Sequence, residues 1–321
     1  MNAFIYNEYG SAEVLQPAEL PKPVILGNEV LVKVEAAGLN PKDSYVREGK
    51  ARILTGRRFP KKTGFDFSGT IVAVGKKVTG YKIGDEVFGF LNNLKGGTLA
   101  EFLAVRQNWF ALKPKSLSHV TSASIPCAYL TALQVLRDLA KIEKGKKVLI
   151  YGASGGVGTA AIQLANYYGA EITSVSSFKN KSYCKLQGAA FNLAYDNDDI
   201  WSLIDRDYDL VFEVYDQRGR LYKQSKSFLN KTGIFVTLSP YPGAFFKSLF
   251  SFLLPRRFKQ FMIRTKTNDL LYLAGLAEKK KINPLVESFA FNDAVQAYRL
   301  LDSHHITSKI VIEISKQSLP Q

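Results

Sequence analysis

The stretch Lys147–Ala165 constrains the fold of this chain more than any other segment. It reads KVLIYGASGGVGTAAIQLA and predicts a buried strand over Lys147–Tyr151, a glycine-rich turn, and an amphipathic helix over Val157–Tyr168. A glycine-rich turn in this context is typical of sites that bind the phosphates of a dinucleotide. Gly155 would let the backbone approach a pyrophosphate, Gly158 would let the helix lie close to the strand, and the helix N-terminus would supply unpaired N–H groups.

The turn departs from the strict G-x-G-x-x-G pattern, because Ala153 stands where the first glycine is expected. A tight strand-to-helix turn without a ligand is the alternative, but a second strand over Glu171–Val175 favours the cofactor interpretation. The candidate cofactor-binding residues of the turn are Ala153, Ser154, Gly155, Gly156, Val157 and Gly158.

The end of the second strand indicates which dinucleotide would bind. NAD-specific sites carry an acid there, about 20 residues after the turn, to hold the ribose 2′-hydroxyl. This chain has Ser176 and Ser177, followed by Lys179 and Lys181. Hydroxyl and ammonium groups would bind a 2′-phosphate, so we expect NADPH, with Ser176, Ser177 and Lys179 as contacts. Solvated loop lysines are the alternative for Lys179 and Lys181.

Strand and helix patterns divide the chain into two parts. Short strands such as Glu29–Ala36 and Gly69–Val74 predict a β-rich first ~115 residues. A helix over 122–140 opens a region of alternating helices and strands, and these strands include Leu210–Val214 and Gly233–Leu238. Such alternation predicts an α/β fold, a doubly wound parallel sheet with helices on both faces.

The C-terminal region adds two helices and one strand. The helices are expected over 268–281, capped by Thr267, and over 292–301. The strand, Lys309–Ile314, is expected to rejoin the first domain.

Composition narrows the class of protein. The 321 residues suggest two domains. The apolar run 248–255 is far shorter than the ~20 residues of a membrane span. The first ten residues lack the pattern of a secretory signal, so we expect a cytoplasmic protein. Two cysteines and three scattered histidines make a structural metal improbable. The net charge of +15 favours an anionic ligand or surface without choosing one.

Several segments in order and spacing resemble the medium-chain dehydrogenase/reductase superfamily, in its zinc-independent quinone oxidoreductase branch. Two of these segments are the glycine turn and Leu130–Leu133. The others are 38–45 (GLNPKDSY), 64–72 (GFDFSGTIV), 74–75 (VG), 80–88 (GYKIGDEVF), 96–101 (GGTLAE) and 308–311 (SKIV). The resemblance implies a GroES-like catalytic domain over 1–120 and 268–321, a Rossmann dinucleotide-binding domain over 121–267, and a homodimer.

The resemblance also bears on the chemistry. Zinc-dependent members carry a ligand cysteine where this chain has Asn40, and a His-Glu pair where it has Phe65-Asp66. We therefore expect no catalytic metal. Hydride transfer from NADPH to a quinone or to the β-carbon of an enone is then the implied reaction, and it needs a donor that polarises the carbonyl oxygen.

By family position, Asn40, Asp43 and Tyr45 would line the catalytic cleft. The alternatives are a turn residue for Asn40, a buried partner of a backbone amide for Asp43, and a core aromatic for Tyr45. Three further residues match cofactor-contacting positions: Thr131 near the nicotinamide, Tyr195 near the 2′-phosphate, and Lys309 near that phosphate or the other end of the cofactor.

Some relatives have a tyrosine just after the position of Gly49 as a substrate contact or proton donor, but this chain has Lys50-Ala51. That difference leaves the proton donor unassigned and disfavours an enoyl-thioester reductase. The stretch 51–60 (ARILTGRRFP) resembles chloroplast-envelope and mitochondrial homologues, which suggests a small lipophilic acceptor.

The segment 240–261 crowds aromatic residues between basic ones. A subunit interface or core is the favoured interpretation, followed by a wall of an apolar pocket and by peripheral membrane contact. A non-enzymatic protein that binds RNA or an anionic surface is the competing function, but no RNA-binding motif supports a nucleic-acid partner.

Overall fold

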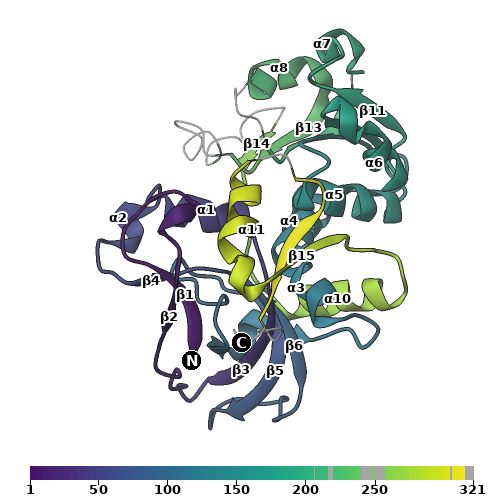
Figure 1. Cartoon of the computed structure of the whole chain (residues 1–321). Coiled ribbons are helices and arrows are strands. Elements are labelled where there is room, and N and C mark those ends of the chain that lie inside the picture. Colours follow the sequence, from purple (N-terminus) through teal and green to yellow (C-terminus); the bar gives the residue numbers. More distant parts are fainter. Residues whose placement is uncertain (206, 216–219, 240–247, 249–256, 304–305, 315–321) are drawn as a thin grey trace. The chain divides into compact units, whose positions relative to one another are not determined.

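The computed structural model describes the whole chain except residues 206, 216–219, 240–247, 249–256, 304–305 and 315–321 (Figure 1). It contains two compact units, one formed by Met1–Leu130 with Arg264–Gln321 and the other by Thr131–Ile263. Residues 121–130 and 264–267, which we expected in the dinucleotide-binding domain, pack with the first unit.

The larger sheet of the first unit has the strand order β15-β16-β3-β5-β6-β8, and β7 also pairs with β3. Its strands are β3 (Glu29–Gly38), β5 (Asp66–Val74), β6 (Glu86–Phe90), β7 (Phe102–Arg106), β8 (Phe110–Leu112), β15 (Val286–Ala290) and β16 (Lys309–Glu313). Among the described strand pairs of this sheet, only β15 and β16 are paired in parallel. Because Val311 of β16 pairs with Gly38 of β3, the end of the chain completes the sheet that the N-terminal region begins.

A smaller antiparallel sheet of the first unit has the order β2-β1-β4. Its strands are β1 (Asn2–Tyr6), β2 (Gln16–Glu19) and β4 (Lys61–Lys62). The α-helices that begin in the first unit are α1 (Pro41–Arg47), α2 (Arg52–Thr55), α3 (His119–Ala123), α4 (Pro126–Leu133), α10 (Thr267–Glu278) and α11 (Ala294–Asp302). Among the residues that the structure describes, no helix is both long and apolar enough to cross a membrane.

Two helix predictions need correction. The continuous helix expected over 122–140 is broken, because α3 ends at Ala123 and α4 begins at Pro126. A proline inside a helix loses a backbone hydrogen bond and clashes with the preceding turn, so it starts a new helix here. Thr267 is the first residue of α10 rather than its cap, since the extended backbone of Lys266 precedes the helix.

The second unit contains the predicted parallel sheet, in the order β11-β10-β9-β12-β13-β14. Its strands are β9 (Lys147–Tyr151), β10 (Glu171–Ser176), β11 (Phe191–Ala194), β12 (Tyr208–Glu213), β13 (Leu229–Thr237) and β14 (Arg257–Gln260). Its described α-helices are α5 (Gly156–Tyr167), α6 (Lys181–Leu186), α7 (Ile200–Leu203) and α8 (Arg220–Phe228), and a π-helical segment covers Gln134–Leu139. Every described strand pair of this sheet is parallel, which confirms the doubly wound α/β prediction.

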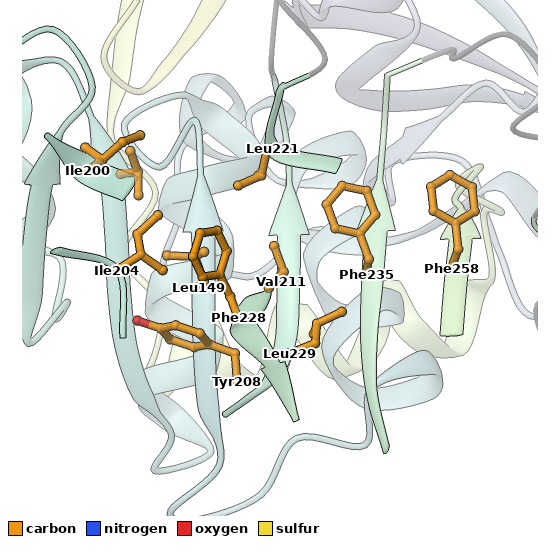
Figure 2. Close-up of a cluster of buried hydrophobic side chains, with 11 residues drawn as sticks. Leu149, Ile200, Ile204, Tyr208, Val211, Leu221, Phe228, Leu229, Phe235 and Phe258 are labelled. Carbon is orange, nitrogen blue, oxygen red and sulfur yellow. The ribbon is translucent and has the colours of Figure 1, made fainter. Parts of the chain in front are cut away.

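One face of this sheet carries a hydrophobic cluster (Figure 2). Leu149 of β9, Val211 of β12 and Phe235 of β13 are at most 1% exposed there. Phe258 of the edge strand stacks on Phe235, with ring centroids 5.7 Å apart. On β9, the residues on either side of Leu149 are also buried, which is expected for a central parallel strand that is covered on both faces. This packing holds the carboxyl end of β9, where the glycine turn begins.

Candidate active site

The glycine turn of the second unit joins β9 to α5. Gly152 has a φ of +80°, a left-handed conformation that favours glycine. The backbone N–H groups of Gly152 and Ala153 both donate to the carbonyl of Val175, at 3.0 and 3.1 Å. The turn is therefore attached to the end of β10, the strand that carries the predicted selectivity residues.

Gly155 and Gly158 have the different surroundings that the sequence predicted for them. A Cβ at Gly158 would lie 2.4 Å from the carbonyl oxygen of Gly152 and 2.5 Å from that of Ala153, so only glycine lets α5 lie this close to the turn. Among the described residues, a Cβ at Gly155 would meet only the Gly152 carbonyl oxygen, at 3.9 Å. The described part of the protein therefore leaves the space beside Gly155 open.

The first turn of α5 supplies hydrogen-bond donors at this open space. The first helical bond runs from Thr159 N–H to the Gly155 carbonyl, at 2.8 Å. Helix geometry leaves the N–H groups of Gly156, Val157 and Gly158 without acceptors within the helix, and the helix dipole favours an anion there. Ser154 is fixed beside them, because Asn180 Nδ2 donates to Ser154 Oγ at 3.1 Å.

The loop after β10 holds the residues predicted to select the cofactor. Ser176 and Ser177 are buried, and the Ser176 hydroxyl donates to the Ser177 carbonyl at 3.1 Å. Lys179 is exposed. The ammonium of Lys181 contacts Asp198 at 3.2 Å. The two lysines therefore differ, since within the described residues only Lys181 contacts a carboxylate.

Tyr195 and Thr131 complete the predicted cofactor residues of this unit. The backbone N–H of Tyr195 donates to the Ser176 carbonyl at 3.0 Å, which brings Tyr195 beside the loop after β10. Its side chain is 47% exposed and stacks on Tyr151, and its pKa is raised, mainly by burial. Thr131 is buried on α4. The cofactor contacts of both residues stay predictions.

The first unit contains a buried polar cluster around Asn40. Lys309 Nζ donates to Asn40 Oδ1 at 2.6 Å, to the Leu39 carbonyl at 2.7 Å and to Asp66 Oδ2 at 3.0 Å. Asn40 Nδ2 donates to the same Asp66 oxygen at 3.0 Å. Asn40, Asp66 and Lys309 are at most 6% exposed, so one carboxylate and one ammonium are buried together.

Asp43 lies in the same cluster, in the first turn of α1. It accepts hydrogen bonds from the N–H of Asn40 at 2.8 Å, the N–H of Gly64 at 2.9 Å and the hydroxyl of Tyr298 at 3.2 Å. Burial raises the pKa of Asp43 to about 6, against the opposing effects of the Asn40 N–H, the Lys309 ammonium and the Tyr298 hydroxyl. Asp43 thus holds the start of α1 and the backbone of Asn40, which agrees with the structural alternative for this residue.

The structure brings Asn40, Asp43 and Lys309 together but does not bring Tyr45 into this cluster. Tyr45 is 39% exposed. Lys309 was predicted to contact the cofactor, and its three N–H donors are instead all used within the first unit. Its cofactor role stays a prediction.

Sequence reasoning missed Asp66 as a member of the site. Burial raises its pKa, and Lys309 and Asn40 oppose that shift. The available signal was its place in the Phe65-Asp66 pair, which we had used only to argue against zinc. Cys127 lies next to Asp66, with its backbone N–H donating to Asp66 Oδ1 at 2.9 Å, and the pKa of its thiol is raised to about 12, mainly by burial.

A second ammonium lies close to this cluster. Lys42 Nζ donates to the Asn93 carbonyl at 2.7 Å and lies over the rings of Phe65 and Phe90, 4.1 and 4.6 Å from their centroids. Burial lowers the pKa of Lys42. In the described part of the chain, no three His, Cys, Asp or Glu side chains are grouped to hold a metal ion. The lack of a catalytic zinc stays a prediction from the sequence.

The residues of the second unit fit a dinucleotide. The open space at Gly155 is the place where a side chain would block a pyrophosphate, and the first N–H groups of α5 adjoin it. Asp196, the carboxylate next to Tyr195, accepts a hydrogen bond from the N–H of Phe178 at 2.7 Å. An exposed ammonium at Lys179 is available for an additional phosphate.

Comparisons with known proteins agree with this geometry. Family models of the alcohol dehydrogenase GroES-like domain and of the zinc-binding dehydrogenases match residues 27–115 and 187–312. A chloroplastic quinone-oxidoreductase homolog of Spinacia oleracea is 31% identical over 98% of both chains. The chain belongs to the quinone oxidoreductase branch of the medium-chain dehydrogenase/reductase superfamily.

Other members of the superfamily extend the comparison. A chloroplastic NADPH-dependent alkenal/one oxidoreductase of Arabidopsis thaliana is 31% identical over 97% of this chain and 79% of its own length. The solved structure of the quinone oxidoreductase from Coxiella burnetii superposes with a TM-score of 0.91 at 31% identity, covering 98% of this chain and 99% of that one. This member of the quinone oxidoreductase branch is therefore an oxidoreductase with a GroES-like sheet and a Rossmann sheet.

Proposed function

We propose that the chain is an NADPH-dependent, zinc-independent reductase that transfers hydride to a quinone or an α,β-unsaturated carbonyl compound. The names of its relatives support the reaction class: a quinone-oxidoreductase homolog, an NADPH-dependent alkenal/one oxidoreductase, and a 2-methylene-furan-3-one reductase of Solanum lycopersicum that is 34% identical. The site described above supports the cofactor.

One observation carries the proposal, namely the open glycine turn next to a strand end that has no acid. The space at Gly155 and the N–H groups of α5 suit a pyrophosphate. β10 ends at Ser176, followed by Ser177 and the exposed Lys179, in place of the carboxylate that would hold a ribose 2′-hydroxyl. A 2′-phosphate would gain a charge-assisted hydrogen bond from Lys179.

The residues of the first unit would act on the acceptor. When bound, reduced nicotinamide supplies the hydride. Asn40 carries an amide donor that suits a carbonyl oxygen on which negative charge develops. Asp43 fixes the backbone of Asn40 by accepting a hydrogen bond from the Asn40 N–H. We place Tyr45 beside the acceptor. The proton that completes the reduction comes from solvent or from a side chain of the site.

Assembly and location belong to the same proposal. We propose a homodimer, which light scattering would report as twice the 35.7 kDa of the chain. Cytoplasmic location stays a prediction. Peripheral membrane contact also stays a prediction, because residues 240–247 and 249–256 of its segment lie outside the described residues.

A titration of the melting temperature with NADPH and with NADH tests the cofactor assignment. Binding to the folded state alone raises stability by about 2.7 kcal/mol when the free ligand is at 100 times its Kd. We expect NADPH to act at lower concentration than NADH. No shift with either dinucleotide would exclude the function.

The acceptor is tested separately with a panel of quinones, 2-alkenals, vinyl ketones and enoyl thioesters. The loss of NADPH absorbance reports turnover. We expect turnover of the lipophilic quinones or enones and little turnover of the thioesters. A preference for thioesters would assign the chain to the alternative reductase class.

A further inference from the structure

The buried ammonium of Lys309 donates to three neighbouring groups of the first unit. Lys309 is the first residue of β16 and is 6% exposed. Its Nζ donates to the Leu39 carbonyl, Asn40 Oδ1 and Asp66 Oδ2. An ammonium has three N–H donors, and here all three are used. Lys309 therefore has no proton left to donate to a substrate or a phosphate in this arrangement.

These contacts fix the orientation of the Asn40 amide. Its oxygen accepts from the ammonium, and its nitrogen donates to the Asp66 carboxylate. A reversed amide would place N–H groups against the ammonium and oxygen against the carboxylate, and both contacts would be repulsive. The buried ion pair therefore selects one of the two amide orientations.

One N–H of Asn40 remains free in this orientation. An amide nitrogen carries two hydrogens, and one of them is used by Asp66. Among the residues that the structure describes, the second has no acceptor. Asn40 is 3% exposed, so this N–H lies in surroundings where a hydrogen bond to a developing oxyanion is strengthened by low dielectric.

Asp66, like Lys309, makes three hydrogen bonds. It is fully buried in β5, and its Oδ1 accepts from the Cys127 N–H at 2.9 Å while Oδ2 accepts from both Asn40 and Lys309. Asn40 directly precedes α1, and its amide is held from two strands, by Asp66 of β5 and by Lys309 of β16.

We propose that Lys309 and Asp66 are a positioning pair that aims the free N–H of Asn40 at the carbonyl oxygen of the acceptor. This inference rests on the proposed function. Bound NADPH would supply the hydride for the new C–H bond at the β-carbon and leave as NADP⁺. The C=C electron pair would shift to give an enolate oxygen, and a proton from water would then complete the α-carbon. Asn40 stabilises the enolate oxygen, and the ion pair keeps the amide from rotating.

The central test is the double variant Lys309→Met with Asp66→Asn, which removes both buried charges together and leaves Asn40 free to rotate. We expect kcat and kcat/KM for an enone to fall about 100-fold, the size of effect seen when one oxyanion donor is lost. We expect the NADPH-induced rise in melting temperature to persist, because the dinucleotide residues lie in the other unit.

Lys113 and Glu86 provide a matched control. Lys113 is also a buried lysine of the first unit, with Nζ donating to the carbonyls of Pro114 and Leu117 and lying 3.2 Å from Glu86. The variant Lys113→Met with Glu86→Gln should keep kcat within about twofold of wild type. An equal loss of kcat in both double variants would mean that removing any buried lysine with its carboxylate partner slows the reaction. That result would overturn the positioning role of Lys309 and Asp66.

A mutant cycle separates positioning from a general structural role. Asn40→Ala should lose about as much kcat as the Lys309/Asp66 double variant, and the triple variant should lose no more than either. If the loss of kcat in the triple variant equals the product of the losses in Asn40→Ala and in the double variant, the pair does not act through Asn40. Wild-type kcat in the double variant would exclude the inference while leaving the proposed function intact.

An NMR measurement on the wild type covers the case in which the double variant does not fold. The Asn40 carboxamide signals are assigned by their loss in Asn40→Ala. We expect one of the two N–H signals to shift when a saturated ketone product is added with NADP⁺. If neither signal moves while the dinucleotide binds, the inference fails. If the wild type neither binds NADPH nor reduces any acceptor, the proposed function has failed instead.

Discussion

At the scale of single residues, the structure separates two lysines that the sequence left together. Lys181 is held by Asp198 at 3.2 Å, whereas Lys179 is exposed. An ammonium already paired with a carboxylate has less to offer a phosphate, so the structure favours Lys179 as the phosphate contact.

Replacing Lys179 tests this assignment. Lys179→Glu should weaken NADPH binding by tenfold or more and NADH binding far less, because hydrogen bonds to charged groups contribute about 1.5–3 kcal/mol. Dissociation constants from fluorescence titration measure both effects. Lys185→Glu, the same charge change at an exposed position of α6, is the control. An equal loss for the two dinucleotides would remove the phosphate role of Lys179.

Residue roles were predictable from the sequence only where a local pattern carried them. Asn40 and Asp43 stand in a recognisable segment, and the glycines stand in another. Asp66 also stands in a recognisable segment, 64–72, but that segment did not indicate its role, because the role of an acid in a β-strand depends on its partners. Its partner Lys309 lies 243 positions away in the chain, so only the folded sheet brings the two together.

At the scale of elements, the β9–α5 turn shows two glycines that serve different purposes. Gly158 is required by the protein itself, because a Cβ would overlap two backbone carbonyls. Gly155 is not required by the protein, since its φ is −75° and its Cβ position is open.

These surroundings predict opposite outcomes for two alanine substitutions. Gly158→Ala should lower the free energy of unfolding by about 1–3 kcal/mol, as expected for overpacking. The free energy of unfolding of Gly155→Ala should lie within about 0.5 kcal/mol of the wild-type value. We expect this variant nevertheless to bind NADPH at least tenfold more weakly. Urea unfolding and fluorescence titration measure the two effects. Wild-type affinity in Gly155→Ala would place the pyrophosphate elsewhere.

Element boundaries were predictable where propensity and packing agreed. β9 was predicted from its apolar run with its observed bounds, Lys147–Tyr151. The helix expected over 122–140 failed, because helical periodicity continues through Ser124 and Ile125 while the backbone is interrupted before Pro126.

At the scale of the whole molecule, stability responds to pH through groups in different elements. His119 of α3 contacts Ser68 Oγ through Nδ1 at 2.8 Å and Glu86 Oε1 through Nε2 at 3.1 Å. Burial lowers the pKa of His119, against the opposing effect of Glu86. Burial raises the pKa of Asp43 to about 6.

The two groups contribute with opposite signs. The unfolded chain binds a proton at His119 more readily than the folded chain does, so this contribution to stability falls as the pH drops through about 6.5. The contribution of Asp43 is present at low pH and is lost as the pH rises through about 6. When the pH is lowered from 7.5 to 5, the free energy of unfolding should therefore fall less in His119→Gln than in the wild type. Urea unfolding at the two pH values measures this difference. Equal losses would contradict the assignment for His119.

The arrangement of the whole molecule was predictable in outline. The alternation of strands and helices predicted the parallel sheet, and the strand at 309–314 was expected to rejoin the first domain. The register that places Lys309 beside Asn40 was not predictable, because it depends on how β16 pairs with β3.

The discontinuity of the first unit has a consequence for synthesis on the ribosome. When the nascent chain has just emerged past β13, every described strand of the second unit's sheet except β14 has been made, whereas β3 still lacks its neighbour β16. The carboxylate of Asp66 then has no contact with the ammonium of Lys309 until translation reaches position 309. Domains tend to fold as units while synthesis continues. The second unit can thus fold first, and Asp66 of the first unit gains its ion-pair partner only after translation has passed position 309.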